Sequence, residues 1–208
     1  RAGGVFAQSH PRIFLDAQRI DKIKAAIQIG GSTHKEAFEM YKAKVDRNNL
    51  DEFGKSSKNW NYARSYAAQA NAFYYCITGE QQYADRAYQH LYDVHNDPDP
   101  DNRLPESGYG LARATVGVGF ATAYDWCYTA WSSSQRDYIK GKIDQALNAW
   151  ESFSHANLGD QKASNWVAVC RGGELTMILC AGEEQSRSDR YSFLKNQLKT
   201  HMHNEIGR

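Results

Sequence analysis

The amino-acid sequence predicts an all-α fold built from repeated helical hairpins. Apolar residues recur with the period of an α-helix along most of the chain, whereas the alternation typical of strands is nearly absent. Three apolar segments, which end in Cys76, Cys127 and Cys180, are each followed by a short turn and a more polar helical segment. A repeat of about 50 residues with this organisation is typical of hairpins that stack into a solenoid or close into an α/α toroid.

Two helices are expected before the repeats. Asp16 is a good N-cap residue for a helix with isoleucines on one face, which the pair Gly30 and Gly31 would end. Thr33 and Glu36 have the spacing of a capping box and predict the start of a second helix. Residues 48–59 are polar and predict a loop.

The repeats themselves predict an inner and an outer layer of helices. Helices are expected over residues 61–78, 80–95, 109–130, 135–150, 164–181 and 188–204. Gly79 is expected to end the first of them. The segments 109–130 and 164–181 carry almost no charge, so we expect them to be buried on several sides, with the more polar 135–150 helix outside.

Four glycines lie inside the predicted inner helices, at Gly117, Gly119, Gly172 and Gly173. Each costs about 1 kcal/mol relative to alanine in a helix interior. Close helix–helix approach is the usual compensation, so we expect tight contacts between inner helices at these positions.

Composition excludes several classes of protein. Of 208 residues, 41% are hydrophobic, which is enough for one large domain with its own core. Lys and Arg number 25 and Asp and Glu 24, and this near balance argues against a nucleic-acid partner. No apolar run approaches the ~20 residues that span a bilayer, so we expect no membrane partner. The sequence does not indicate an oligomeric state.

The four cysteines do not resemble a metal site. No CxxC pair occurs, and no cysteine has metal-ligand spacing from a histidine pair. We therefore expect no metal, and we interpret the cysteines as small buried hydrophobic residues. A disulfide is the alternative.

Aromatic, amide and basic side chains gather where three inner helices are expected to start. They are Trp60, Tyr62 and Arg64 in the first, Tyr109 and Arg113 in the second, and Asn165 and Trp166 in the third. In a toroid these starts share one rim, so the side chains would converge there. Aromatic rings stack on sugar rings, and arginine forks bind carboxylate or sulfate bidentately, which favours an acidic polysaccharide as ligand. The alternative is that the tryptophans anchor the core and Asn165 caps a helix.

Three further residues could contribute chemistry. His155 lies in the loop before Asn165 and could reach the same rim, although a lone histidine in a loop is more often simply solvated. Asp125 and Glu174 are single charges in apolar helices. They could form the carboxylate pair of a glycosidase, or each could make a buried structural hydrogen bond or ion pair.

Four segments together resemble heparinase II/III-like polysaccharide lyases, a superfamily that includes alginate lyases. They are residues 10–15 (HPRIFL), 72–87, 123–126 (AYDW) and 164–173, and their order and spacing carry the resemblance. It implies that residues 1–208 form one incomplete α/α toroid of a secreted or periplasmic enzyme. The implied substrate is a uronic-acid polymer, either a glycosaminoglycan such as heparan sulfate or alginate.

The resemblance also implies a reaction, β-elimination at a uronic acid. Asn165 matches the amide that neutralises the substrate carboxylate, while Trp166 stands where some relatives have a histidine. The resemblance further implies that a catalytic tyrosine and a β-sandwich domain follow Arg208, the sandwich being an intramolecular partner, and that this part of the chain needs no cofactor. Two alternatives remain, a glycoside hydrolase on an α/α barrel and a non-catalytic helical-repeat module that binds a glycan or a protein.

Overall fold

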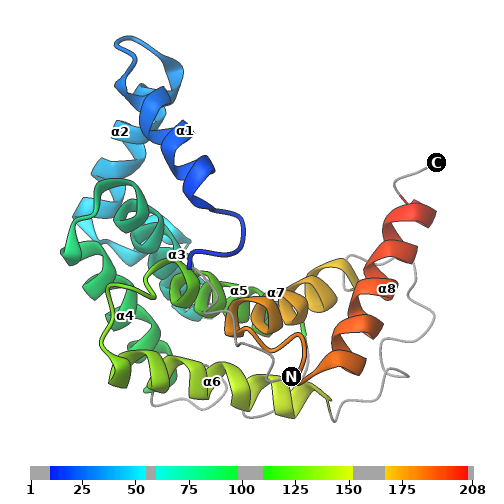
Figure 1. The fold of residues 1–208 in the computed structure, drawn as a ribbon. Coiled ribbons are helices and arrows are strands. Elements are labelled where there is room, and N and C mark those ends of the chain that lie inside the picture. The colour runs from blue at the N-terminus through cyan, green and yellow to red at the C-terminus, as the bar shows by residue number, and fades with distance from the viewer. Residues whose placement is uncertain (1–9, 55–59, 98–109, 152–166, 206–208) are drawn as a thin grey trace, which may run out of the picture.

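The computed structural model describes residues 10–54, 60–97, 110–151 and 167–205, and over these ranges the fold is all-helical without a strand (Figure 1). The helices are α1 (Ala17–Gln28), α2 (Thr33–Arg47), the 3-10 turn η1 (Leu50–Phe53), α3 (Trp60–Thr78), α4 (Gln81–His95), α5 (Leu111–Trp126), α6 (Ser133–Glu151), the π-helical turn η4 (Val167–Arg171), α7 (Gly172–Ala181) and α8 (Ser188–Glu205). The all-α prediction is therefore confirmed for this part of the chain. No helix in these ranges is long and apolar enough to cross a membrane.

Several predicted helix ends are confirmed. Asp16 caps α1, where its Oδ1 accepts a hydrogen bond from the Arg19 amide at 2.7 Å. Gly79 follows α3 with a φ of 75°, in the left-handed region that favours glycine. Gly182 ends α7 in the same way, with a φ of 73°.

Other boundaries differ from the prediction. The N-cap of α2 is Ser32 rather than Thr33, because the Ser32 hydroxyl accepts a hydrogen bond from the Lys35 amide at 3.2 Å. Part of the expected loop 48–59 forms η1. The helix expected over 109–130 ends at Trp126, and residues 127–130 form a turn.

The helices form two layers, as the hairpin repeat predicts. Figure 1 shows α3, α5 and α7 in a row, with α4 and α6 along one side of it and α8 beyond α7. The turn between the layers is fastened by Trp131, whose indole N–H donates to the carbonyl of Ala84 in α4 at 2.9 Å. Trp150 and Phe120 lie fully buried between the layers.

The three inner helices run in the same direction. Ser65, near the start of α3, hydrogen-bonds to the carbonyl of Val116 in the first half of α5, and Cys76, near the end of α3, bonds to the carbonyl of Trp126 at the end of α5. Gly173, at the start of α7, packs against Ala114 near the start of α5. The starts of α3, α5 and α7 therefore lie at the same end of the layer.

Three of the four inner-helix glycines lie at close contacts, and at Gly119 and Gly173 these contacts include backbone atoms. A Cβ on Gly119 would overlap the Ser65 hydroxyl and lie 2.9 Å from the Ser65 carbonyl oxygen. One on Gly173 would lie 2.9 Å from both Cβ and O of Ala114, and one on Gly117 would lie 2.8 Å from Met177 Sδ. The prediction is wrong for Gly172 within the described part of the chain, where no atom lies within 4 Å of the added carbon.

All four cysteines are free, and three are fully buried, which confirms their interpretation as small hydrophobic residues. Burial raises the pKa of the Cys76 thiol to about 12 and that of Cys170 to about 11, so both stay protonated at neutral pH.

Candidate functional site

The common direction of α3, α5 and α7 brings together the helix starts in which the sequence placed candidate binding residues. Tyr62, Arg64 and Arg113 are the candidates whose side chains the structure describes, and all three are partly buried. Burial raises the pKa of the Tyr62 phenol, so at neutral pH this side chain is a hydrogen-bond donor rather than a base. The side chain of Trp60 and the residues Tyr109, His155, Asn165 and Trp166 lie outside the described residues.

The two arginines at this end differ in their partners. Arg64 Nη1 lies 3.2 Å from Asp97 Oδ2 and 3.4 Å from the Asp93 carbonyl oxygen, so its charge is compensated at the end of α4. Arg113 makes no hydrogen bond or ion pair with any residue in the described part of the chain. Arg113 is therefore the better placed of the two to bind an external carboxylate or sulfate.

A second feature of α3 is a pocket of about 390 Å³ that sequence reasoning did not anticipate. Its walls come from α2, η1, α3 and the end of α5, and we call it the Lys44 pocket. Its main lining residues are Tyr41, Lys44, Phe53, Tyr66, Phe73 and Trp126. The rings of Tyr66 and Tyr62 lie one helical turn apart with centroids 6.3 Å from one another, so the pocket adjoins the start of α3.

Positive charge exceeds negative charge at this pocket once Arg47, which binds Glu52, is counted with Lys44. Lys44 Nζ lies 4.7 Å from the centre of the Phe53 ring and 5.2 Å from that of Tyr41. Glu52 also lines the pocket, but Arg47 binds its carboxylate bidentately at 2.8 and 2.7 Å and lowers its pKa through these hydrogen bonds. No carboxylate oxygen of the described residues lies within 4 Å of Lys44 Nζ, and Lys44 interacts with Glu52 only at longer range.

The sequence contains a pattern that corresponds to this pocket, but the same pattern is typical of a core helix. Tyr62, Tyr66, Gln69 and Phe73 recur at helical spacing along one face of α3. Such a stripe is usually part of a core. Tyr66 is instead 44% exposed, because it lines the open pocket.

Asp125 anchors the segment that opens the domain. Its fully buried carboxylate accepts hydrogen bonds from the amides of Arg12, at 2.9 and 3.0 Å, and Ile13, at 3.0 Å, and pairs with His10 Nδ1 at 2.5 Å. The neighbouring Trp126 donates from its indole N–H to the Ile13 carbonyl at 3.0 Å. Two of the four segments that carry the family resemblance therefore bind one another directly.

The same opening segment also reaches the end of α7. Arg12 Nη1 donates to the Leu179 carbonyl at 2.7 Å, and its Nη2 pairs with Glu184 at 2.6 Å. The segment thus ties the ends of α5 and α7 together.

Glu174, the other candidate glycosidase carboxylate, is also engaged within the protein. It is fully buried and receives two hydrogen bonds from Arg190, at 2.5 Å from Nε and 2.7 Å from Nη2. Asp125 and Glu174 each make the structural interaction that was the alternative for them. A glycosidase that used these carboxylates would need them exposed to substrate. Both are buried and bound within the protein, which argues against their use in hydrolysis.

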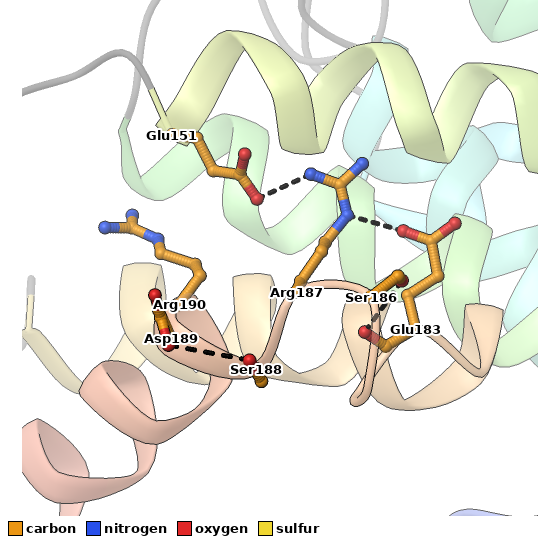
Figure 2. Close-up of a pocket in the computed structure, with 7 residues that line it drawn as sticks. All are labelled: Glu151, Glu183, Ser186, Arg187, Ser188, Asp189 and Arg190. Atoms are coloured by element: carbon orange, nitrogen blue, oxygen red, sulfur yellow. Dashed lines mark hydrogen bonds and ion pairs between the residues drawn. The ribbon is translucent and has the colours of Figure 1, made fainter.

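A charged pocket of about 500 Å³ lies between α6 and the start of α8 (Figure 2). Arg187 lies at its centre and donates to Glu183 and Glu151, both at 2.5 Å, and to Asn148 at 2.8 Å. Burial opposes ionisation of Glu183, but hydrogen bonds from Lys140 and Arg187 lower its pKa to about 2. The charges of Arg187, Glu183 and Glu151 pair with one another and fasten the turn after α7 to α6. Asp189 also lines the pocket and lies 3.5 Å from the Ser188 hydroxyl.

Comparisons with known proteins add no family to this geometry. No protein-family model matches the chain, and no curated protein is similar to it.

Proposed function

We propose that the chain is the α/α-toroid part of a secreted or periplasmic polysaccharide lyase that cleaves a uronic-acid polymer by β-elimination. The observation that carries this proposal is the common direction of the inner helices. It brings Tyr62 of α3 and Arg113 of α5, which has no partner among the described residues, to the end from which η4 also starts. In the sequence, η4 directly follows the Ser164-Asn165-Trp166 segment.

The bond between Asp125 and the opening segment gives further support. The resemblance to heparinase II/III-like lyases rests on short segments, each of which is only moderately specific. Residues 10–15 and 123–126 are far apart in the sequence, yet they form one buried interaction. Their joint occurrence therefore has a structural reason, which makes a chance match of two unrelated segments a weaker explanation.

The chemistry assigns distinct tasks to the site residues. A base removes the C5 proton of the uronate, the electron pair forms the C4–C5 double bond, and the C4–O bond breaks as the leaving oxygen takes up a proton. The C5 proton is too weakly acidic for this while the adjacent carboxylate keeps its full charge. In the proposal Asn165 hydrogen-bonds to that carboxylate and Arg113 binds a carboxylate or sulfate on the chain. Tyr62 supplies a stacking surface.

An elimination assay tests this proposal. The natural gene product would be incubated with alginate, heparan sulfate and a neutral glucan, and the unsaturated product would be followed by its ultraviolet absorbance and by mass spectrometry. We expect unsaturated ends from a uronate polymer alone. Products of hydrolysis without a new double bond would overturn the proposal in favour of a hydrolase. Binding of the polymer without any product would favour the non-catalytic module.

The role of Asn165 is tested by its replacement. Asn165→Ala is expected to lower kcat by about a hundredfold or more, the size found when a group that stabilises a developing oxyanion is removed. The melting temperature should stay within a few degrees of that of the wild type. Full retained activity would contradict the assignment.

A further inference from the structure

We infer that the Lys44 pocket binds an anionic sugar unit of the polymer at a distance from the bond that is cleaved. This inference rests on the proposed function, since it names where a second unit of the same substrate is held. The pocket extends along α3 from Tyr66, one turn after Tyr62, to Phe73.

The walls of the pocket have the chemistry of a sugar site. Tyr66 and Tyr41 are 44% and 39% exposed, so both offer ring surface to a ligand. The apolar faces of sugar rings stack on such side chains, which bury a large area at a small cost in conformational entropy. Gln69 adds an amide whose Nε2 is held by the Thr122 hydroxyl at 3.0 Å, which leaves its carbonyl oxygen to accept from a sugar hydroxyl.

The charge of the pocket selects an anionic unit. Lys44 is the one cation among the described lining residues, and the rings of Phe53 and Tyr41 lie beside its ammonium and exclude part of its water. An ammonium in such surroundings interacts more strongly with an anion than a fully solvated lysine does. Arg47 holds Glu52 in a bidentate pair, and Glu52 also interacts with Lys44 at longer range, so these three side chains together carry one surplus positive charge.

A row of aromatic side chains on α3 links the pocket to the proposed site. Tyr62 and Tyr66 stack with an interplanar angle of 29°, and Phe73 follows Tyr66 by about two turns on the same face. From Tyr62 to Phe73 the helix rises about 16 Å. A polymer bound at the start of α3 could therefore continue along this row of side chains to Lys44.

The test measures binding of defined oligosaccharides to the natural gene product by titration calorimetry. The probes are a hexamer of alginate, a heparin hexasaccharide and neutral cellohexaose. Lys44→Met keeps the aliphatic stem and removes the charge, and Tyr66→Ala removes the stacking surface. We expect at least one of the two acidic hexamers to bind more tightly than cellohexaose. Each substitution should weaken that binding about tenfold, through the lost charge-assisted contact in Lys44→Met and the lost stacking surface in Tyr66→Ala.

Matched control variants separate a pocket effect from a general one. Lys35→Met removes an equally charged side chain from the same helix, where Lys35 pairs with Glu39 at 3.8 Å. Tyr92→Ala removes a tyrosine of similar exposure, 40%, from the outer helix α4. Both controls should bind within about twofold of the wild type, and circular dichroism checks the fold of every variant.

The outcomes distinguish this inference from the proposed function. The inference is overturned if no acidic hexamer binds, or if Lys44→Met and Tyr66→Ala bind as tightly as the controls. If the gene product then still releases unsaturated sugars, the proposed function stands without the pocket. If the hexamer binds through Lys44 and Tyr66 but no unsaturated product forms, the pocket is a glycan site on a protein that is not a lyase. In an active lyase, both substitutions should raise KM for long polymers more than they lower kcat.

Discussion

Replacing Gly119 by alanine should destabilise the protein, whereas the same replacement at Gly172 should not. Both glycines lie in inner helices, and neither has a positive φ. At Gly119 the added carbon would overlap the Ser65 hydroxyl and lie 2.9 Å from the Ser65 carbonyl oxygen. At Gly172 it would meet no atom of residues 10–54, 60–97, 110–151 or 167–205 within 4 Å.

The size of the difference follows from two opposing effects. Alanine is favoured over glycine in a helix by about 1 kcal/mol, which stabilises both variants. Inserting a methyl group into a well-packed contact costs about 1–3 kcal/mol and sometimes more, and at Gly119 a backbone atom is among those that must move. We expect Gly119→Ala to lose about 2 kcal/mol of unfolding free energy, and Gly172→Ala to be unchanged or more stable by up to about 1 kcal/mol.

Urea denaturation followed by far-ultraviolet circular dichroism measures both unfolding free energies. Ser65→Ala should restore part of the stability of Gly119→Ala, because it removes the hydroxyl but leaves the Ser65 backbone oxygen and Cβ in contact. The same substitution should restore nothing in Gly172→Ala. The packing argument is refuted if Gly119→Ala is as stable as the wild type, or if both alanine variants lose the same stability.

Two further predictions concern buried polar groups. Burial lowers the pKa of His90 to about 4, from 6.5 in the unfolded chain, so the unfolded state binds a proton first as the pH falls. The contribution of His90 to stability is complete above about pH 6.5 and decreases toward pH 4 by about 3 kcal/mol; the loss of stability between pH 7 and 4.5 should be smaller in His90→Gln, and an equal loss would contradict the assignment. Asp125→Ala leaves His10 and the amides of Arg12 and Ile13 without their acceptor and should cost about 3–5 kcal/mol. Limited proteolysis should then cut near His10 faster than in the wild type, and unchanged cleavage would argue against the anchor.

Much of the fold could be predicted because it depends on local patterns. The helical period, the Asp16 cap and the Gly79 stop are properties of short stretches of sequence, and the structure confirms them. The error at Thr33 is of the same local kind, since Ser32 and Thr33 are both good caps and the backbone decides between them.

The site residues were less predictable because their roles depend on distant partners. Arg64 and Arg113 stand at similar places in successive inner helices and have the same chemistry, yet Asp97 neutralises Arg64. Nothing near either arginine in the sequence distinguishes them. The Lys44 pocket was missed for the same reason, because its walls come from four separate elements.

The sequence by itself determined the helical repeat and the inner and outer layers, because both follow from the period of apolar residues. It predicted close contacts at four glycines, and the tertiary structure decided that Gly117, Gly119 and Gly173 make them. The tertiary structure alone decided what the isolated charges do. Asp125 is one carboxylate in an apolar helix, and its cost of burial is offset by amides more than a hundred residues earlier in the chain. Such a partner is set by the path of the backbone in space, which periodicity does not encode.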